Sequence, residues 1–426
     1  MERVIFIFSV FFIFSFIHAE EKKNTISEDP FFLFEEEKYL NELFHQIQGL
    51  YVDGLYALVI PKAEEYLKKA PIDDPNKGKV IQTLVAAYYY TGNSKKLYKL
   101  VLTYGKDYLS RDLIARVVMY FQRKEEFDIV NTLFDKFSFL KNELEKEYKT
   151  VKGFELGKNI FLLEDDNTVF GENKLYISPE NQTLVEIAKQ TDMGYFELRL
   201  ANPDINPFAI KKGDMILIPR RRIIPEINYQ LNTIYINLSE KRLYYPTEIE
   251  GKKYVITFPV GIGTDETGTK TGEYEISQKR ENPSWYVPEN IKKENPELPD
   301  VFPPGEDNPL GTRAMRLGNT ALLIHGTNKK FGIGMKVSHG CIRMYNHDVE
   351  RLFDLVKEGT KVKVIDLPYK FGFKAKKLYV EISTDGSIDL NEFLQKISSY
   401  IKDIKKKNIY EIKLKLLQRG YAIPFK

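Results

Sequence analysis

The hydrophobic pattern of this 426-residue chain changes its period near residue 150. Before that point apolar residues recur every three or four positions, as in KVIQTLVAAYYYTGNSKKLYKLVLTYG and DLIARVVMYFQRKEEFDIVNTLFDKF. This spacing predicts amphipathic helices. From residue 230 to about 367 apolar and polar residues alternate instead, as in TIYINLSEKRLYYP and KKYVITFPVGIG, which predicts strands. The chain is therefore expected to be multidomain, with an all-α region (20–150) ahead of a mainly-β domain (230–367) of the sandwich or barrel kind.

The polar turns TGNS and RKEE divide the helical region about 30 residues apart. That interval is typical of stacked helical hairpins of the tetratricopeptide sort. Most signature residues of that repeat are missing, so an irregular helical bundle fits equally well. Residues 368–426 contain one predicted strand, KLYVEIS, and basic helical segments, which we expect to form a C-terminal α/β appendage.

Between these regions, residues 173–220 predict a small strand–helix–helix–strand unit. The strand LYIS precedes a helix at TLVEIAKQ, for which Thr183 is a suitable N-cap, and MILIP closes the unit after a Pro-rich loop. The stretch resembles the LysM module in NQTLVEIA, in Asn202 and in IKKGDMILIP. The resemblance implies binding of glycans that contain N-acetylglucosamine. The alternative is a structural insert that binds nothing.

The N-terminus indicates export. Residues Val4 to Ile17 are apolar except for two serines. As a helix they would span about 21 Å, which is short of a hydrocarbon core of about 30 Å. We therefore expect a signal peptide (1–19) cut after Ala19, with an uncleaved membrane anchor as the alternative because Glu2 offsets Arg3. The 63 basic and 60 acidic residues nearly balance, so no nucleic-acid partner is indicated.

Cys341 is the only cysteine, so it cannot form a disulfide within the chain. Three of the five histidines, His325, His339 and His347, lie within 23 residues of one another, and Cys341 lies among them. A thiol with a pKa of about 8.5 needs a base or a cation nearby to act as a nucleophile, and histidine serves best near neutral pH. The cluster therefore favours a nucleophilic cysteine over a buried structural one.

The residues beside Cys341 suit acyl chemistry. Gly326 follows His325 at the end of the predicted strand TALLI, so the imidazole is expected to emerge at a strand end. Gly340 lets the backbone approach a substrate, and amides at positions 340 and 341 could form an oxyanion hole. Arg343 is suited to holding a carboxylate through two hydrogen bonds.

Zinc held by Cys341, two histidines and His347 is the competing interpretation. The His-x-Cys spacing is tighter than usual for zinc and no Cys-x-x-Cys accompanies it. We therefore predict no metal at this site and no cofactor.

The stretch IHGTNKKFGIGMKVSHGCIRM, with FPVGIG, GTKTGEYEI and PPGEDNPLG, resembles the L,D-transpeptidase family of the YkuD fold. The likeness runs from about residue 175 to 382 and is greatest to periplasmic, LysM-containing enzymes of Gram-negative bacteria. It implies that Cys341 is the nucleophile, that His325 is the base, and that His339 supports the thiolate and the oxyanion site.

The same resemblance assigns Ser338 as the motif serine, Gly340 as the oxyanion-loop glycine, and Arg343 and Gly326 to substrate or oxyanion contacts. Lys270 departs from the family, which usually has proline in this turn, and this puts the rigidity of the turn in doubt.

Two further side chains have the chemistry of site residues. His347 has no family role and is expected at the solvent-facing start of a helix. Trp285, in NPSWYVP, is expected either to line a substrate channel or to anchor its loop.

The resemblance implies a two-step acyl transfer on peptidoglycan in the periplasm. Cys341 would form a thioester with the third stem residue and release D-alanine, and an amine would then take the acyl group to give a 3→3 cross-link. The acceptor stays open. An outer-membrane lipoprotein lysine would make that lipoprotein a partner, water would make the protein an L,D-carboxypeptidase, and a free D-amino acid could also accept the acyl group.

Two different classes of function compete with this interpretation. One is an inactive peptidoglycan-binding scaffold, against which the intact set of Cys341, His325 and His339 argues. The other is a sortase-like protein transpeptidase, whose characteristic spacing of a cysteine before an arginine is not evident in this sequence.

Overall fold

The computed structural model describes residues 30–142, 150–164, 167–226, 228–329, 331–384, 390–400, 410 and 419–425. The predicted signal peptide lies outside these residues. The chain divides into two compact units, residues 1–97 and 98–426. Among the described residues no helix is both long enough and apolar enough to cross a bilayer.

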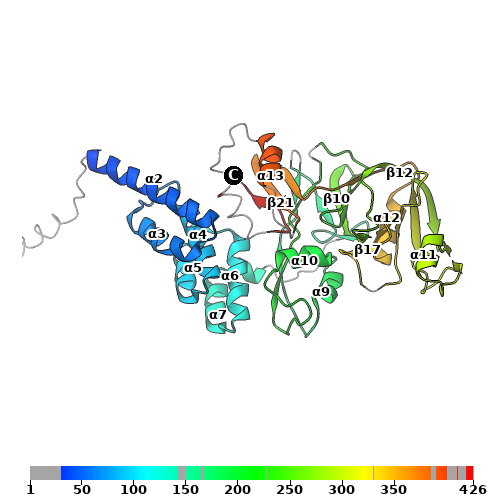
Figure 1. Ribbon diagram of the computed structural model, residues 1–426, viewed down its shortest axis with the longest axis horizontal. Helices are drawn as coiled ribbons and strands as arrows, with labels where there is room; N and C mark the ends of the chain where they lie inside the picture. Colours follow the sequence, from blue (N-terminus) through cyan, green and yellow to red (C-terminus); the bar gives the residue numbers. More distant parts are fainter. Residues whose placement is uncertain are drawn as a thin grey trace, which may run out of the picture. The chain divides into compact units, whose positions relative to one another are not determined.

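The first unit is helical, as predicted. It contains α2 (Pro30–Val52), α3 (Tyr56–Lys69) and α4 (Lys77–Tyr90), drawn in blue in Figure 1. α2 packs on α3 and α3 on α4, burying Val59, Ala63 and Leu84. The TGNS turn separates α4 from α5 (Ser94–Tyr108), which runs across the division between the units.

Helices also open the second unit. α6 (Arg111–Arg123) and α7 (Phe127–Lys136) are separated at the RKEE turn, and α8 (Phe139–Asn142) follows. The Arg116 guanidinium donates to the Ala201 carbonyl at 3.0 Å, and the Gln122 amide donates to the Gly213 carbonyl at 3.2 Å. α6 is therefore fixed to the small domain that follows it. The predicted boundary at residue 150 is not tested by this division and stays a prediction.

The predicted strand–helix–helix–strand unit is present. β5 (Lys174–Ile177) pairs antiparallel with β6 (Met215–Ile218), and α9 (Leu184–Gln190) and α10 (Tyr195–Ala201) lie between them in sequence. We call residues 173–220 the βααβ module. Thr183 caps α9 in a capping box with Glu186. The Asn202 side chain bonds both the N–H and the C=O of Leu217, which ties the end of α10 to β6.

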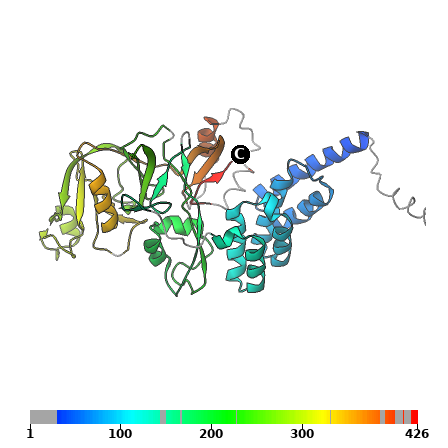
Figure 2. The same ribbon diagram turned by 180° about the vertical axis from the view of Figure 1, so that it is seen from behind.

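The mainly-β domain is built on a nine-stranded sheet within the described residues (Figures 1 and 2). Its order is β18-β16-β15-β12-β19-β8-β9-β10-β3. The strands are β3 (Ile160–Leu162), β8 (Ile234–Asn237), β9 (Arg242–Ile249), β10 (Lys252–Pro259), β12 (Gly272–Glu281), β15 (Arg313–Leu317), β16 (Leu323–His325), β18 (Ile342–Arg343) and β19 (Lys361–Ile365).

Most neighbours in this sheet are antiparallel, but β8 with β19 and β16 with β18 are parallel. β12 pairs with β19 along its first half and with β15 along its second, with an irregularity between Ile276 and Gln278. α12 (Asn346–Leu355) packs on β15 and β16. Alternation of apolar residues buries one face of these strands in a common core, which includes Ile236, Ile256 and Ile324.

Short elements complete the domain. β11 (Ile262–Gly263) pairs with β17 (Lys336–Ser338), and β1 (Thr150–Val151) with β2 (Phe154–Glu155). The segment 283–310, which we call the cleft roof, contains β13 (Trp285–Tyr286), α11 (Glu289–Glu294) and β14 (Val301–Phe302). It joins β12 to β15 at one end of the sheet.

The C-terminal appendage contains three strands, where the sequence predicted only KLYVEIS, because β21 (Lys377–Ile382) pairs on both sides. β20 (Tyr369–Lys374) and β22 (Ile423–Pro424) are its two antiparallel neighbours. α13 (Leu390–Ser398), in orange in Figure 1, packs Phe393 on Tyr369 and Phe371. β4 (Val169–Phe170) and β7 (Arg222–Ile223) form a pair beside this sheet. The basic segment 401–409 lies outside the described residues.

A buried network of charged side chains joins these parts, and we call it the junction network. Lys370 Nζ lies 2.6 Å from Glu240 Oε1 and 2.9 Å from Glu381 Oε2. Arg222 Nη2 lies 3.1 Å from Glu197 Oε1, and Arg222 Nη1 lies 3.3 Å from Glu381 Oε1. Every side chain of the network is at most 3% exposed. The members are Glu197 of α10, Arg222 of β7, Glu240, Arg242 of β9, Lys370 of β20 and Glu381 of β21.

Candidate active site around Cys341

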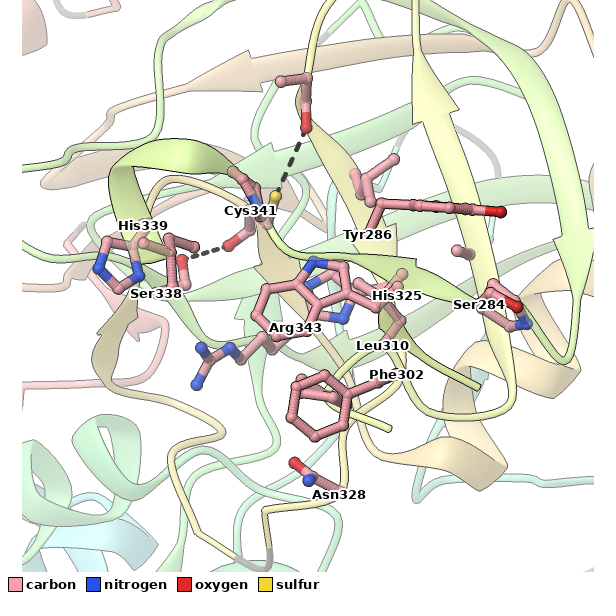
Figure 3. A pocket seen from close by; sticks show the side chains of 18 of the residues that line it. Ser284, Tyr286, Phe302, Leu310, His325, Asn328, Ser338, His339, Cys341 and Arg343 are labelled. Atoms are coloured by element: carbon pink, nitrogen blue, oxygen red, sulfur yellow. Dashed lines mark hydrogen bonds between the residues drawn. The ribbon is translucent and has the colours of Figure 1, made fainter. Parts of the chain in front are cut away.

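Parallel pairing of two short strands brings the predicted nucleophile and base together. His325 is the last residue of β16 and pairs with Arg343 of β18, and Cys341 directly precedes β18. Cys341, His325 and Arg343 line one cleft of about 850 Å³ beneath the roof (Figure 3). The structure therefore unites three residues that lie within 19 consecutive positions of the sequence.

A backbone carbonyl sets the tautomer of His325. Its Nδ1 lies 2.6 Å from the Gly326 oxygen. A carbonyl only accepts hydrogen bonds, so Nδ1 carries the proton and Nε2 is left as the basic nitrogen. Burial lowers the pKa of His325 to about 4; the positive charge of Arg343 acts in the same direction, and the Gly326 carbonyl opposes both. The imidazole is thus neutral at pH 7, as a general base must be.

The Cys341 thiol is partly shielded from solvent. Its Sγ donates to the Ala321 carbonyl at 3.7 Å. Burial raises the pKa of the thiol, whereas a backbone contact at Leu323 and the charges of Arg343 and Arg316 act to lower it. A raised thiol pKa beside a base with a lowered pKa favours a neutral resting pair. The proton must then leave Cys341 as the substrate is attacked.

Ser338 holds the turn that presents Cys341. Its Oγ donates to the Cys341 carbonyl at 2.5 Å and accepts the Gly340 N–H at 3.2 Å. Gly340 has a φ of +107°, which residues other than glycine rarely adopt. The Gly340 N–H is therefore bound within the turn, and the oxyanion role expected of the amides at positions 340 and 341 stays a prediction.

Two threonines that the sequence alone did not indicate support this turn. Thr269 Oγ1 donates to the Gly340 carbonyl at 2.8 Å, and Thr267 Oγ1 donates to the Ser338 carbonyl at 3.0 Å. Both lie in the segment around GTKTG that contributed to the family resemblance, although nothing in their spacing indicated these contacts. Lys270, the departure from the family pattern, is in the same segment, where its carbonyl accepts the Tyr274 hydroxyl at 3.1 Å.

Gly326 is required by close packing. A Cβ at this position would lie 2.2 Å from Asn346 Oδ1. Asn346, the first residue of α12, accepts the Thr327 N–H at 2.9 Å through that oxygen. Asn346 thus holds the loop after His325, and its position in the sequence carried no signal of this role.

His339 faces the roof. Its Nε2 lies 3.1 Å from Glu294 Oε2 of α11, and both side chains are exposed, by 40% and 55%. His339 still lines the cleft with Cys341. Its expected support of the thiolate stays a prediction, and the observed contact links the Cys341 turn to the roof.

The cleft is cationic and partly aromatic. Arg343 lines it with Arg316 and Arg280, and among the described side chains the Arg343 guanidinium has no carboxylate partner. Trp285 fulfils both expectations. It lines the cleft, and it packs on Phe302 with ring centroids 5.6 Å apart, which anchors the roof hairpin. Such a cleft suits a peptide that carries carboxylates.

His347 lies at the start of α12, half exposed as predicted. Its Nε2 contacts Asp192 at 3.6 Å and Asp348 at 3.3 Å. It does not join Cys341, so the zinc set that would combine these two residues is not formed.

Comparison with known proteins agrees with this geometry. The YkuD family, described as the L,D-transpeptidase catalytic domain, matches residues 231–364. The Escherichia coli (strain K12) protein named Probable L,D-transpeptidase YbiS is 37% identical over 213 residues, covering 48% of this chain and 68% of that protein. This chain belongs to the L,D-transpeptidase family. Its nine-stranded sheet with α12 is therefore an L,D-transpeptidase catalytic domain.

Other L,D-transpeptidases are also similar to this chain. Probable L,D-transpeptidase YcfS of Escherichia coli (strain K12) is 41% identical over 209 residues, which is 47% of this chain and 64% of that protein. Probable L,D-transpeptidase ErfK/SrfK of Salmonella typhimurium is 34% identical, covering 52% of this chain and 72% of that protein. The catalytic domain of the E. faecium L,D-transpeptidase is 21% identical, with a TM-score of 0.25, over 32% of this chain and 99% of that one. The chain thus spans about two thirds of the curated relatives.

Proposed function

We propose that this protein is an L,D-transpeptidase that acts on peptidoglycan in the periplasm. The observation that carries the proposal is that one cleft is lined by Cys341 and by a buried, neutral His325 whose Nε2 is the basic nitrogen. The names of the relatives support the reaction class. The arginines of the cleft support a substrate peptide that carries carboxylates.

In the first step His325 Nε2 takes the proton of Cys341, and Sγ attacks the carbonyl carbon of the third stem residue. The tetrahedral oxyanion is stabilised by the Cys341 N–H. The bond to the D-alanine nitrogen then breaks. His325 returns the proton to that nitrogen, so D-alanine leaves as a neutral amine and a thioester remains on Cys341.

In the second step an acceptor amine enters the same cleft. His325 removes its proton as the nitrogen attacks the thioester carbonyl, and Cys341 leaves as the thiol after reprotonation. A second stem peptide as acceptor gives a 3→3 cross-link. With water as the acceptor the protein is an L,D-carboxypeptidase. With a lysine of an outer-membrane lipoprotein as the acceptor, the reaction attaches that lipoprotein to peptidoglycan. The acceptor is left to experiment.

Export and glycan binding belong to the same proposal. Residues 1–19 would direct the chain to the periplasm, where a single cysteine has no second thiol in the chain to trap it. The βααβ module would act as a LysM module that holds the glycan strand. Its loop between α10 and β6 exposes Phe208 by 79%, which offers an aromatic surface for a sugar face.

The test is incubation with peptidoglycan that carries tetrapeptide stems, followed by mass spectrometry of the muropeptides, with Cys341→Ala in parallel. Dimers joined through two third-position residues, absent with Cys341→Ala, are expected. D-alanine release without dimers would show that the acyl group passes to water or to a protein acceptor and not to a second stem peptide. Sacculus binding with no chemistry from the unsubstituted chain would leave a scaffold and contradict the proposal.

Glycan binding is tested separately by co-sedimentation with sacculi. Phe208→Ala is expected to weaken sedimentation, while leaving D-alanine release from a soluble stem peptide unchanged. Unchanged sedimentation would remove Phe208 from the glycan contact.

A further inference from the structure

Three possible metal ligands from distant parts of the chain meet outside the cleft. Asp192 lies in the turn between α9 and α10, whereas His347 and Asp348 lie in the first turn of α12. One ligand atom from each lies within 4.8 Å of the others. The cluster thus spans the contact between the βααβ module and the catalytic domain.

Asp348 is the member that points to a missing ligand. Its side chain is fully buried, and within the described part of the chain neither carboxylate oxygen accepts a hydrogen bond. Burial of a carboxylate without donors is costly, so such groups are normally paired or bind a metal. The atom that approaches it is His347 Nε2, at 3.3 Å from Oδ1.

The distances from His347 to the two aspartates fit a small tetrahedral ion. His347 Nε2 lies 3.3 Å from Asp348 Oδ1 and 3.6 Å from Asp192 Oδ1. With metal–ligand bonds of about 2.1 Å, two ligands of a tetrahedral ion are separated by about 3.4 Å. Both measured separations are near that value.

Neighbouring groups orient the ligands. Lys158 Nζ and Asn159 Nδ2 each lie 3.4 Å from Asp192 Oδ2, so Oδ1 is the oxygen that faces His347. The Tyr345 ring stacks on the His347 ring, with centroids 5.6 Å apart and planes 8° apart. Outer contacts of this kind hold ligands in place in metal sites.

We propose that Asp192, His347 and Asp348 bind one divalent zinc-like ion, with water as the fourth ligand on the exposed side of His347. One imidazole and two carboxylates suit zinc, whereas calcium takes six to eight oxygens. The ion would clamp the βααβ module to α12. Asn346, which begins α12, holds the loop after His325, so the clamp lies one element away from the active site.

The experiment uses the full chain carrying Cys341→Ser, because the thiol could itself bind zinc. After removal of metals with a chelator, zinc is titrated by calorimetry and the melting temperature is measured with and without zinc. One equivalent of zinc and a higher melting temperature are expected, with no such effect of magnesium or calcium.

Two ligand variants and one control locate the site. His347→Gln and Asp348→Asn should each weaken zinc binding by more than the roughly 10- to 100-fold typical of losing an outer partner. His45→Gln, an exposed histidine on α2, should leave binding unchanged. His347 is half exposed, so its variant should fold, which circular dichroism checks.

Two results would overturn the proposal. The first is the absence of stoichiometric zinc binding by the parent. The second is zinc binding that His347→Gln or Asp348→Asn leaves intact.

Discussion

The junction network and the cleft roof both depend on charged side chains, but they differ in burial. Lys370 and its two carboxylate partners are at most 1% exposed. In the roof, Glu294 is 55% exposed where it meets His339, and Asp300 is 92% exposed where it meets Lys292. Buried charges cannot separate without a large cost, whereas exposed ones exchange partners with water. The first arrangement fixes neighbouring parts of the second unit, whereas the second leaves the contacts of the roof open to solvent.

The largest expected effect comes from disrupting the buried junction network. Lys370→Met removes one of the two buried cations that contact Glu240 and Glu381 and leaves Arg222 as the other, so it should lower the free energy of unfolding by about 3 kcal/mol. Urea denaturation measures it. Lys292→Met, which removes an exposed roof ion pair, is the control and should cost less than about 1 kcal/mol. Equal losses for the two variants would refute the distinction.

The next effect concerns His325 in the cleft, where burial lowers the pKa of the imidazole. The pKa of His325 is lowered to about 4, so kcat/KM for D-alanine release should fall tenfold per pH unit only below about pH 4. Because His325 is harder to protonate in the folded chain than in the unfolded chain, its neutral form also contributes to the free energy of unfolding. This stability is fully present above the unfolded pKa of about 6.5 and is lost as the pH falls towards 4. An acid limb near pH 6.5, with the fold intact by circular dichroism, would show that His325 is solvated.

A smaller effect is expected at the turn 338–341, which presents Cys341 to the cleft. Thr269→Val removes the hydrogen bond to the Gly340 carbonyl and the acceptor for the Gly263 N–H. We expect a loss of about 1–2 kcal/mol of stability and a roughly tenfold lower kcat/KM from misplacement of Cys341. The alkylation rate of Cys341 should change as well, which a purely structural role would not require. Thr103→Val, which removes an exposed helix hydroxyl, is the matched control.

The smallest effect belongs to the roof. Glu294→Gln keeps the shape of the side chain but removes its charge opposite His339. Stability should change by less than about 1 kcal/mol, and KM for the stem peptide by at most about fivefold. Complete loss of activity in this variant would mean that Glu294 is part of the catalytic machinery. The exposed contacts of the roof would then matter as much as the buried ones of the junction network.

Much of the molecule could be predicted from sequence because its signals are local. Helical periodicity predicted the helices of the first unit, and Thr183 as an N-cap predicted the start of α9. The position of His325 at the end of the strand TALLI predicted that its imidazole emerges at a strand end, and the structure places it in one cleft with Cys341. These features depend on residues close together in the chain, where a helix period, a cap or a strand end has a fixed geometry.

The residues that the sequence did not reveal depend on long-range contacts. Thr269 lies 71 residues before Gly340, and Glu294 lies 45 residues before His339, so no local pattern connects them. Asp192 and His347 are separated by 155 positions, and a threonine, a glutamate or an aspartate alone indicates nothing about its partner. The charged members of the junction network resemble ordinary surface residues in the sequence, and only folding buries them.

The sequence by itself predicted Cys341 as the nucleophile, His325 as its base and the kinds of secondary structure around them, because motif and periodicity are properties of neighbouring residues. Only the tertiary structure decided the protonation tendencies of the pair, the contacts that hold the Cys341 turn, and the cluster at Asp348. Burial and electrostatic environment depend on which distant segments pack together, and that is a property of the whole fold.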